Sequence, residues 1–222
     1  MKQYISTHTS AGAIGLFLFL FISTGCASMA ERHHPDYANY KGTFRTLLIL
    51  PPQFQIMDEM ADQKILYNGD LSRTAGELSL EAVVDHLTGK DYRTRVLPPE
   101  TAAADEIQQI TALFATVNRS IQLHTYGSQP FPFQKQSFEY AVGNIENLLR
   151  KNNADAMVLV TGKETLSSFY PRVWISVALI EPKGEIVWYC VQGANEILQL
   201  GDIKDMAMLV KKTLQNFPSG TQ

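Results

Sequence analysis

The sequence predicts one α/β domain, in which a mixed, mostly parallel sheet with a C-terminal β-hairpin is covered by helices. An apolar run at residues 46–50 and a stretch of alternating apolar and polar residues at 92–97 each stop at a pair of prolines, and a helical pattern lies between them. This order predicts a β-α-β unit with parallel strands. Later, two more apolar runs flank Glu-Pro-Lys-Gly at 181–184, which is turn chemistry and predicts the hairpin.

The first part of the domain is expected to be strand, loop and helix. Residues 46–50 (TLLIL) are uniformly apolar, as in a strand buried on both faces, and the following proline pair is expected to end that strand. Residues 53–69 have no clear period and are expected to form a long loop. The helix that follows has Ser72 as its expected N-cap and Gly89 as its expected left-handed C-terminal residue.

The later elements follow from alternating or three-and-four spacings of apolar residues. In order, they are a strand at 92–97, a helix at 102–118, an irregular insertion at 120–137, a helix at 138–151, a strand at 156–160, hairpin strands at 173–180 and 185–191, and a helix at 203–217. The third strand is expected to close at Thr161-Gly162.

The N-terminus carries the anatomy of a secretory signal. Lys2 is the only charge among residues 1–25, and the apolar run at 11–22 would span ~18 Å as a helix, too short for a bilayer. Small residues precede Cys26 in the stretch FISTGCAS, which resembles the bacterial lipobox, where a peptidase cuts before a cysteine that carries diacylglycerol. Ser23 stands where that pattern favours a branched aliphatic residue.

The organisation expected from this signal has four parts: a lipoprotein signal peptide at 1–25, a flexible tether at 26–43, the α/β domain at 44–217, and a disordered tail at 218–222. Two other fates of Cys26 stay open, a plain cleaved signal peptide and a disulfide with Cys190. Cys190 lies in an apolar run and is expected to be a lone core thiol.

The expected location is the cell envelope, at the periplasmic face of the outer membrane. Ala27 rather than Asp follows Cys26, and this favours the outer membrane under the sorting rule of Gram-negative lipoproteins. The membrane is reached through the lipid alone. A formal net charge of −3 argues against a nucleic-acid partner bound by bulk charge.

Four short stretches carry a resemblance to known proteins: RTLLILPP at 45–52, YRTRVLPP at 92–99, NNADAMVLVTG at 152–162 and PKGEIVWY at 182–189. In this order they resemble uncharacterised bacterial lipoproteins whose fold is similar to the amino-terminal domain of TolB. The curli-secretion lipoprotein CsgG and the Pel-polysaccharide lipoprotein PelC have related domains. The resemblance covers 44–216 and implies an assembly or docking part of an envelope machine, often in rings or oligomers.

No catalytic motif is present in the sequence. It contains no G-x-S-x-G, H-E-x-x-H, C-x-x-C or phosphate loop, so no enzyme, cofactor or metal is expected. Adjacent His33 and His34 lie on the expected tether without further ligands. His86 is expected to be a capping or surface histidine, and His124 to have a structural role.

Aromatic residues mark two candidate partner-binding segments. Tyr126, Phe131 and Phe133 lie in the irregular insertion, and Phe169 and Tyr170 precede the hairpin. Each group can be a hydrophobic plug of the domain itself or an exposed patch for a partner, and both interpretations stay open.

The expected function is that of a lipid-anchored accessory or scaffold protein in a secretion, transport or polymer-export complex. It would act through contacts with envelope proteins, a homo-oligomer included. The alternative is a small-ligand or glycan-binding lipoprotein with its site near the carboxyl ends of the parallel strands, around Pro51, Pro98 and Gly162.

The lipobox assignment makes a direct prediction. Cys26→Ser should abolish labelling of the protein by radioactive or alkyne-bearing fatty acid in cells, because the thiol that carries the lipid is gone. A variant that is still labelled would remove the assignment.

Overall fold

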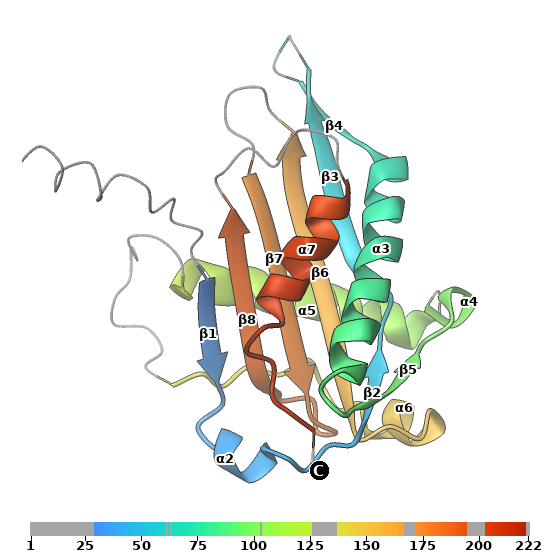
Figure 1. The fold of residues 1–222 in the computed structure, drawn as a ribbon, viewed down its shortest axis with the longest axis vertical. Helices are drawn as coiled ribbons and strands as arrows, with labels where there is room; N and C mark the ends of the chain where they lie inside the picture. The colour runs from blue at the N-terminus through green and yellow to red at the C-terminus, as the bar shows by residue number, and fades with distance from the viewer. Residues whose placement is uncertain are drawn as a thin grey trace, which may run out of the picture.

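The computed structural model describes residues 29–60, 62, 64–102, 104–125, 137–166, 172–194 and 203–220. These residues form an eight-stranded mixed sheet with the order β1-β8-β7-β6-β2-β5, and β3 and β4 extend it beside β6 (Figure 1). The strands are β1 (Met29–His33), β2 (Thr46–Ile49), β3 (Gln53–Glu59), β4 (Ile65–Tyr67), β5 (Arg93–Val96), β6 (Ala156–Leu166), β7 (Arg172–Ile180) and β8 (Ile186–Ala194). The α/β class, the mixed sheet and the C-terminal hairpin are confirmed.

Helices cover both faces of the sheet. On one face lie α3 (Gly69–Thr88) and α7 (Ile203–Thr213), and on the other lie α5 (Asp105–Thr125) and α6 (Glu146–Lys151) (Figure 1). The helices α2 (Tyr37–Tyr40) and α4 (Pro99–Ala102) are short. None of the described helices combines the length and the hydropathy that a membrane span needs.

The core is divided by the sheet into two layers. Alternation along β6 sends Val158 and Val160 under α3 and α7, and Met157 and Leu159 under α5 and α6. The neighbouring Trp188 and Tyr189 of β8 go to opposite faces, and both are fully buried. A strand with apolar side chains on both faces is the reason that these segments are continuously apolar in sequence.

The proline pair at 51–52 interrupts a strand path that continues beyond it. Both β2 and β3 pair in parallel with β6: Ile49 faces Val158, and Gln53 faces Thr161. The chain therefore has one more residue than β6 between these two pairs. This extra residue makes a β-bulge. Prolines are accommodated at a bulge because the strand pairing is interrupted there and does not need their missing N–H groups.

The long loop predicted for 53–69 is wrong, because β3 and β4 form an antiparallel hairpin there. Phe54 and Ile56 are buried, while Gln53 and Gln55 are exposed. This period of two is present in the sequence and was the signal for a strand.

The helix α3 is confirmed, but its ends differ from the prediction. Its N-cap is Asn68, whose side chain accepts a hydrogen bond from a first-turn N–H. Ser72 lies inside the helix, where its Oγ accepts from Ile56 N at 2.9 Å and thereby ties α3 to β3. Gly89 has a right-handed φ of −66°, and the left-handed residue is Asp91 at 67°.

Two other helices also differ in extent. The helix predicted at 102–118 continues as α5 to Thr125, into the segment predicted to be irregular. The helix predicted at 138–151 is limited to α6. Gly143 has a φ of 83°, and Val142 N donates to Gly184 O at 2.8 Å, so the preceding segment lies along the β7–β8 turn instead.

Both ends of the described chain are held by the domain. The flexible tether predicted for 26–43 is wrong from Met29 on, because all five residues of β1 pair antiparallel with β8. The disordered tail predicted for 218–222 is wrong as far as Gly220, whose N–H donates to Lys90 O at 3.0 Å. Backbone pairing to edge positions, which composition does not signal, orders both segments.

The burial of Glu164 predicts a pH-dependent stability. Its side chain lies on the α3–α7 face of β6, and burial raises the pKa of its carboxyl. When the pKa of a carboxyl is higher in the folded state than in the unfolded state, its ionisation lowers the free energy of unfolding at pH values above the folded-state pKa. Below the unfolded-state pKa of ~4.3 the group is protonated in both states and has no such effect. Glu164→Gln should therefore raise the Tm by a few degrees at pH 8 and leave it unchanged at pH 4.

The matched control is Glu81→Gln, at an exposed position of α3. It should change the Tm little at either pH. Calorimetry that finds the same Tm shift for Glu164→Gln at both pH values would contradict the role of ionisation.

Candidate functional site

The residues predicted for lipidation and for partner binding lie outside the described part of the chain. These are Cys26 for lipidation, and Tyr126, Phe131, Phe133, Phe169 and Tyr170 for partner binding. They stay predictions. The described residues instead form a groove that the sequence analysis did not assign.

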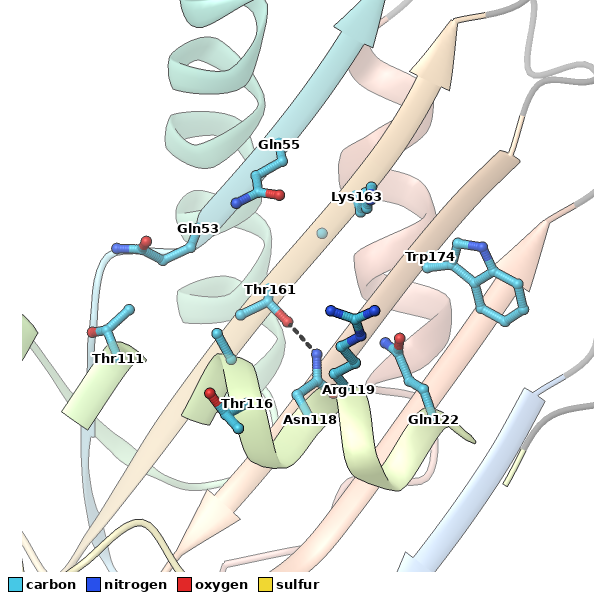
Figure 2. A pocket seen from close by; sticks show the side chains of 12 residues that line it. Gln53, Gln55, Thr111, Thr116, Asn118, Arg119, Gln122, Thr161, Lys163 and Trp174 are labelled. Atoms are coloured by element: carbon cyan, nitrogen blue, oxygen red, sulfur yellow. Dashed lines mark hydrogen bonds between the residues drawn. The ribbon is translucent and has the colours of Figure 1, made fainter. Parts of the chain in front are cut away.

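The groove has a volume of about 630 Å³ and lies between helix α5 and the strands β3, β6 and β7 (Figure 2). Along β6, Met157 and Leu159 are buried on this side, and the next two residues on the same side are Thr161 and Lys163. On β7, Ser176 is followed in the same direction by Trp174. One face of the sheet thus changes from apolar to polar along its length, and the groove opens where it changes.

Helix α5 supplies the opposite wall. Thr111, Ala115, Asn118 and Gln122 line the groove, and their spacing of four, three and four places them on one side of the helix. This stripe lies beside the apolar stripe that packs on the sheet. Figure 2 shows Gln122 and Arg119 of the helix near Lys163 and Trp174 of the strands.

The charged side chains among the described residues that line the groove are all positive. Arg119 and Lys163 are cationic and exposed, and none of the twelve described residues that line the groove is acidic. The other polar groups are amides and hydroxyls, including the amides of Gln53 and Gln55 on β3. Such a lining attracts anions and offers hydrogen bonds to polar, uncharged groups.

Three hydrogen bonds, one of them buried and two half-buried, join the two walls of the groove. The hydroxyl of Tyr189 donates to Asn118 Oδ1 at 2.6 Å, and Asn118 Nδ2 donates to Thr161 Oγ1 at 3.1 Å. Gln122 Nε2 donates to Ser176 Oγ at 3.0 Å. Because Tyr189 and Ser176 are buried, these contacts hold α5 in register with the sheet and orient the amides before any ligand arrives.

Two glycines of the sheet near the groove make room for aromatic rings. The indole of Trp174 packs over Gly193 of β8, where a Cβ would approach it to 3.0 Å. On the other side of the sheet, the ring of Phe54 occupies the space that a side chain at Gly162 would need. Of the three residues around which the alternative site was predicted, Gly162 lines the groove, and Pro51 and Pro98 do not.

The histidines do not make a metal site in the described structure. His33 Nε2 lies 3.0 Å from Glu31 Oε1, and the buried His34 lies 3.8 Å from Glu185. No three His, Cys, Asp or Glu residues of the described ranges cluster as metal ligands. His86 was expected to be a capping or surface histidine; it is half-buried, and burial, followed by the charge of Lys90, lowers its pKa. The side chain of His124 is outside the described part.

Cys190 is a buried core thiol, as predicted. Burial, together with the charge of Glu31, raises the pKa of its thiol to about 12. The thiolate that nucleophilic chemistry needs is therefore suppressed at neutral pH.

No protein-family model and no curated protein matches the chain. Among solved structures, the PelC dodecamer from Paraburkholderia phytofirmans is similar over 89% of this chain and 100% of that chain, with 12% sequence identity and a TM-score of 0.45. Lipoprotein GNA1162 from Neisseria meningitidis is similar over 77% of this chain and 94% of that chain, with 13% identity and a TM-score of 0.35.

Gly162→Ala should destabilise the protein, because the added methyl group overlaps the buried ring of Phe54. The expected loss is ~1–3 kcal/mol of unfolding free energy, measured by urea denaturation. Gly69→Ala is the matched control. A Cβ there lies at an ordinary 3.5 Å from Tyr67, so the unfolding free energy should change by less than ~1 kcal/mol. Equal effects of the two variants would contradict the close packing at Gly162.

Proposed function

We propose that the chain is a lipid-anchored, non-catalytic protein of the cell envelope that binds an acidic saccharide in the groove. The observation that carries the proposal is the lining itself, which has two cations and no carboxylate among its described residues. An anionic ligand gains from both cations, and no lining carboxylate opposes it.

The rest of the lining favours a saccharide over a simple anion. A sugar ring presents many hydroxyl groups, which the exposed amides of Gln53 and Gln55, together with Gln122, can serve as donors and acceptors. Trp174 adds a flat apolar surface beside these polar groups. A groove that is open at the surface can also bind one segment of a longer polysaccharide.

The two cations should provide most of the selectivity for acidic over neutral sugars. A hydrogen bond to a charged group contributes ~1.5–3 kcal/mol, or ~10–100-fold in affinity. Arg119 and Lys163 are exposed, so solvent screening places them at the lower end of that range.

The anchor in this proposal is the lipid on Cys26. A protein held at the periplasmic face of the outer membrane would meet the acidic glycans of the envelope there. The sequence signal before Cys26 supports this location, and Ala27 supports the choice of membrane.

A second candidate is the accessory or scaffold role in a secretion, transport or polymer-export complex, with or without self-association. The exposed Leu113 and Leu123 on α5 favour it, with 43% and 59% of their side chains accessible, because they offer apolar contact area beside the groove. A photo-crosslinking residue at Leu113 should trap envelope proteins in intact cells, whereas one at Glu81 on α3 should not. Equal trapping at both positions would remove the support for this role.

The saccharide proposal predicts that the full chain in detergent binds uronic-acid oligosaccharides more tightly than neutral ones of equal length. Arg119→Gln and Lys163→Gln should each weaken this binding by ~10-fold, in a calorimetric titration. Higher salt should weaken binding to the wild type more than binding to either variant.

The matched control is Lys183→Gln, in the β7–β8 turn away from the groove, where the same charge is lost and binding should not change. Equal affinity for acidic and neutral oligosaccharides, or an equal loss in all three variants, would overturn the proposal.

A further inference from the structure

The β3–β4 hairpin exposes apolar side chains together. Ile65, Leu66 and Tyr67 form the whole of β4, and their side chains are 56%, 52% and 62% exposed. Met60, at the end of β3, is also exposed. A short edge strand with three exposed apolar residues in a row is uncommon on a surface that faces only water.

The anchor lies close to the folded domain. Only Ala27 and Ser28 separate Cys26 from Met29, the first residue of β1. Three Cα steps of ~3.8 Å span at most ~11 Å, whatever path the chain takes. If Cys26 carries the lipid, the end of the sheet at which β1 begins therefore lies next to the membrane surface.

Strand pairing shows which other parts of the sheet lie at that end. Met29 faces Gln192, Gln192 faces Ile175, Ile175 faces Gly162, and Gly162 faces Phe54. This row crosses the sheet at one level. From it, β3 runs in the direction opposite to β1, toward the end where the anchor is attached.

The hairpin extends beyond that level. Met60 lies six residues after Phe54, which corresponds to ~20 Å of strand at ~3.3 Å per residue. Figure 1 shows β3 and β4 reaching further toward this end than the start of β1. The hairpin thus extends further from the domain than the chain between Met29 and Cys26 can.

The hairpin carries three carboxylates, Asp58, Glu59 and Asp62, and one cation, Lys64. Asp62 forms an ion pair with Lys64 at 2.6 Å, and Asp58 accepts a hydrogen bond from Asn68 at 2.8 Å, so these two carboxylates have partners within the hairpin region. The hairpin offers no basic cluster for anionic headgroups. Its aliphatic side chains and the tyrosine instead match the boundary between headgroups and acyl chains.

We propose that the β3–β4 hairpin inserts Ile65, Leu66 and Tyr67 into the interfacial layer of the membrane to which the chain is anchored. The lipid and the hairpin are then two contacts at the same end of the sheet. Together they fix the orientation of the domain, and the groove, which shares β3 with the hairpin, is held at a set height above the lipid. This inference depends on the lipid anchor and not on the saccharide.

The test uses the full lipidated chain in zwitterionic phosphatidylcholine vesicles. Leu66→Cys introduces a thiol that can be labelled with an environment-sensitive fluorophore, because Cys26 is blocked by lipid and Cys190 is buried. The expected result is a blue-shifted emission that spin-labelled lipids quench and that higher salt does not change. Lys183→Cys, in the turn at the opposite end of β7 and β8, should give a water-like, unquenched signal.

Mass spectrometry of the N-terminal peptide separates the two ways in which the inference can fail. An acylated protein whose Leu66 label is not quenched overturns the hairpin contact and leaves the anchor standing. A Leu66 label that is shielded only when envelope proteins are added overturns the lipid contact in favour of a protein partner. An unacylated Cys26 overturns the anchor and the inference with it.

Discussion

The structure depends on the backbone pairing of one strand, β6. It has eleven residues and is paired along most of its length on both sides, in parallel with β2 and β3 and antiparallel with β7. Successive side chains of β6 point to opposite faces of the sheet and enter the two core layers in turn. Both halves of the core, and with them the positions of the covering helices, therefore depend on β6. The groove also depends on β6. It lies where the residues of this strand that face α5 change from apolar to polar while the strand continues.

Much of the fold could be predicted from patterns of apolar residues. The strands at 46–50 and 92–97, the helix α3 and the hairpin were found because packing determines those positions. The apolar pattern predicts that the third strand ends at Thr161-Gly162, whereas β6 runs on to Leu166 through residues that are more polar. A buried strand is recognisable in the sequence because its residues are apolar. A half-exposed strand that is held by backbone hydrogen bonds has a much weaker pattern.

The groove was missed for the same reason. Its residues are ordinary Thr, Asn, Gln, Arg and Lys, which form no motif and come from separate parts of the chain. Two local signals were present, the alternation from Gln53 to Ile56 and the polar stripe from Thr111 to Gln122, but only the tertiary structure places them across from one another. Gly162 was expected near a strand end, but β6 continues past it, and its lack of a side chain makes room for Phe54 on the opposite face of the sheet.

The pairing of β1 with β8 has a mechanical consequence. A flexible tether would absorb a pull on the N-terminus by extending, whereas here the load passes to the domain at Met29. The pull acts along the axis of β1, and the five paired residues resist it in shear, so their hydrogen bonds share the force instead of opening one after another. The strand β1 is therefore suited to transmit tension at Met29 into the sheet.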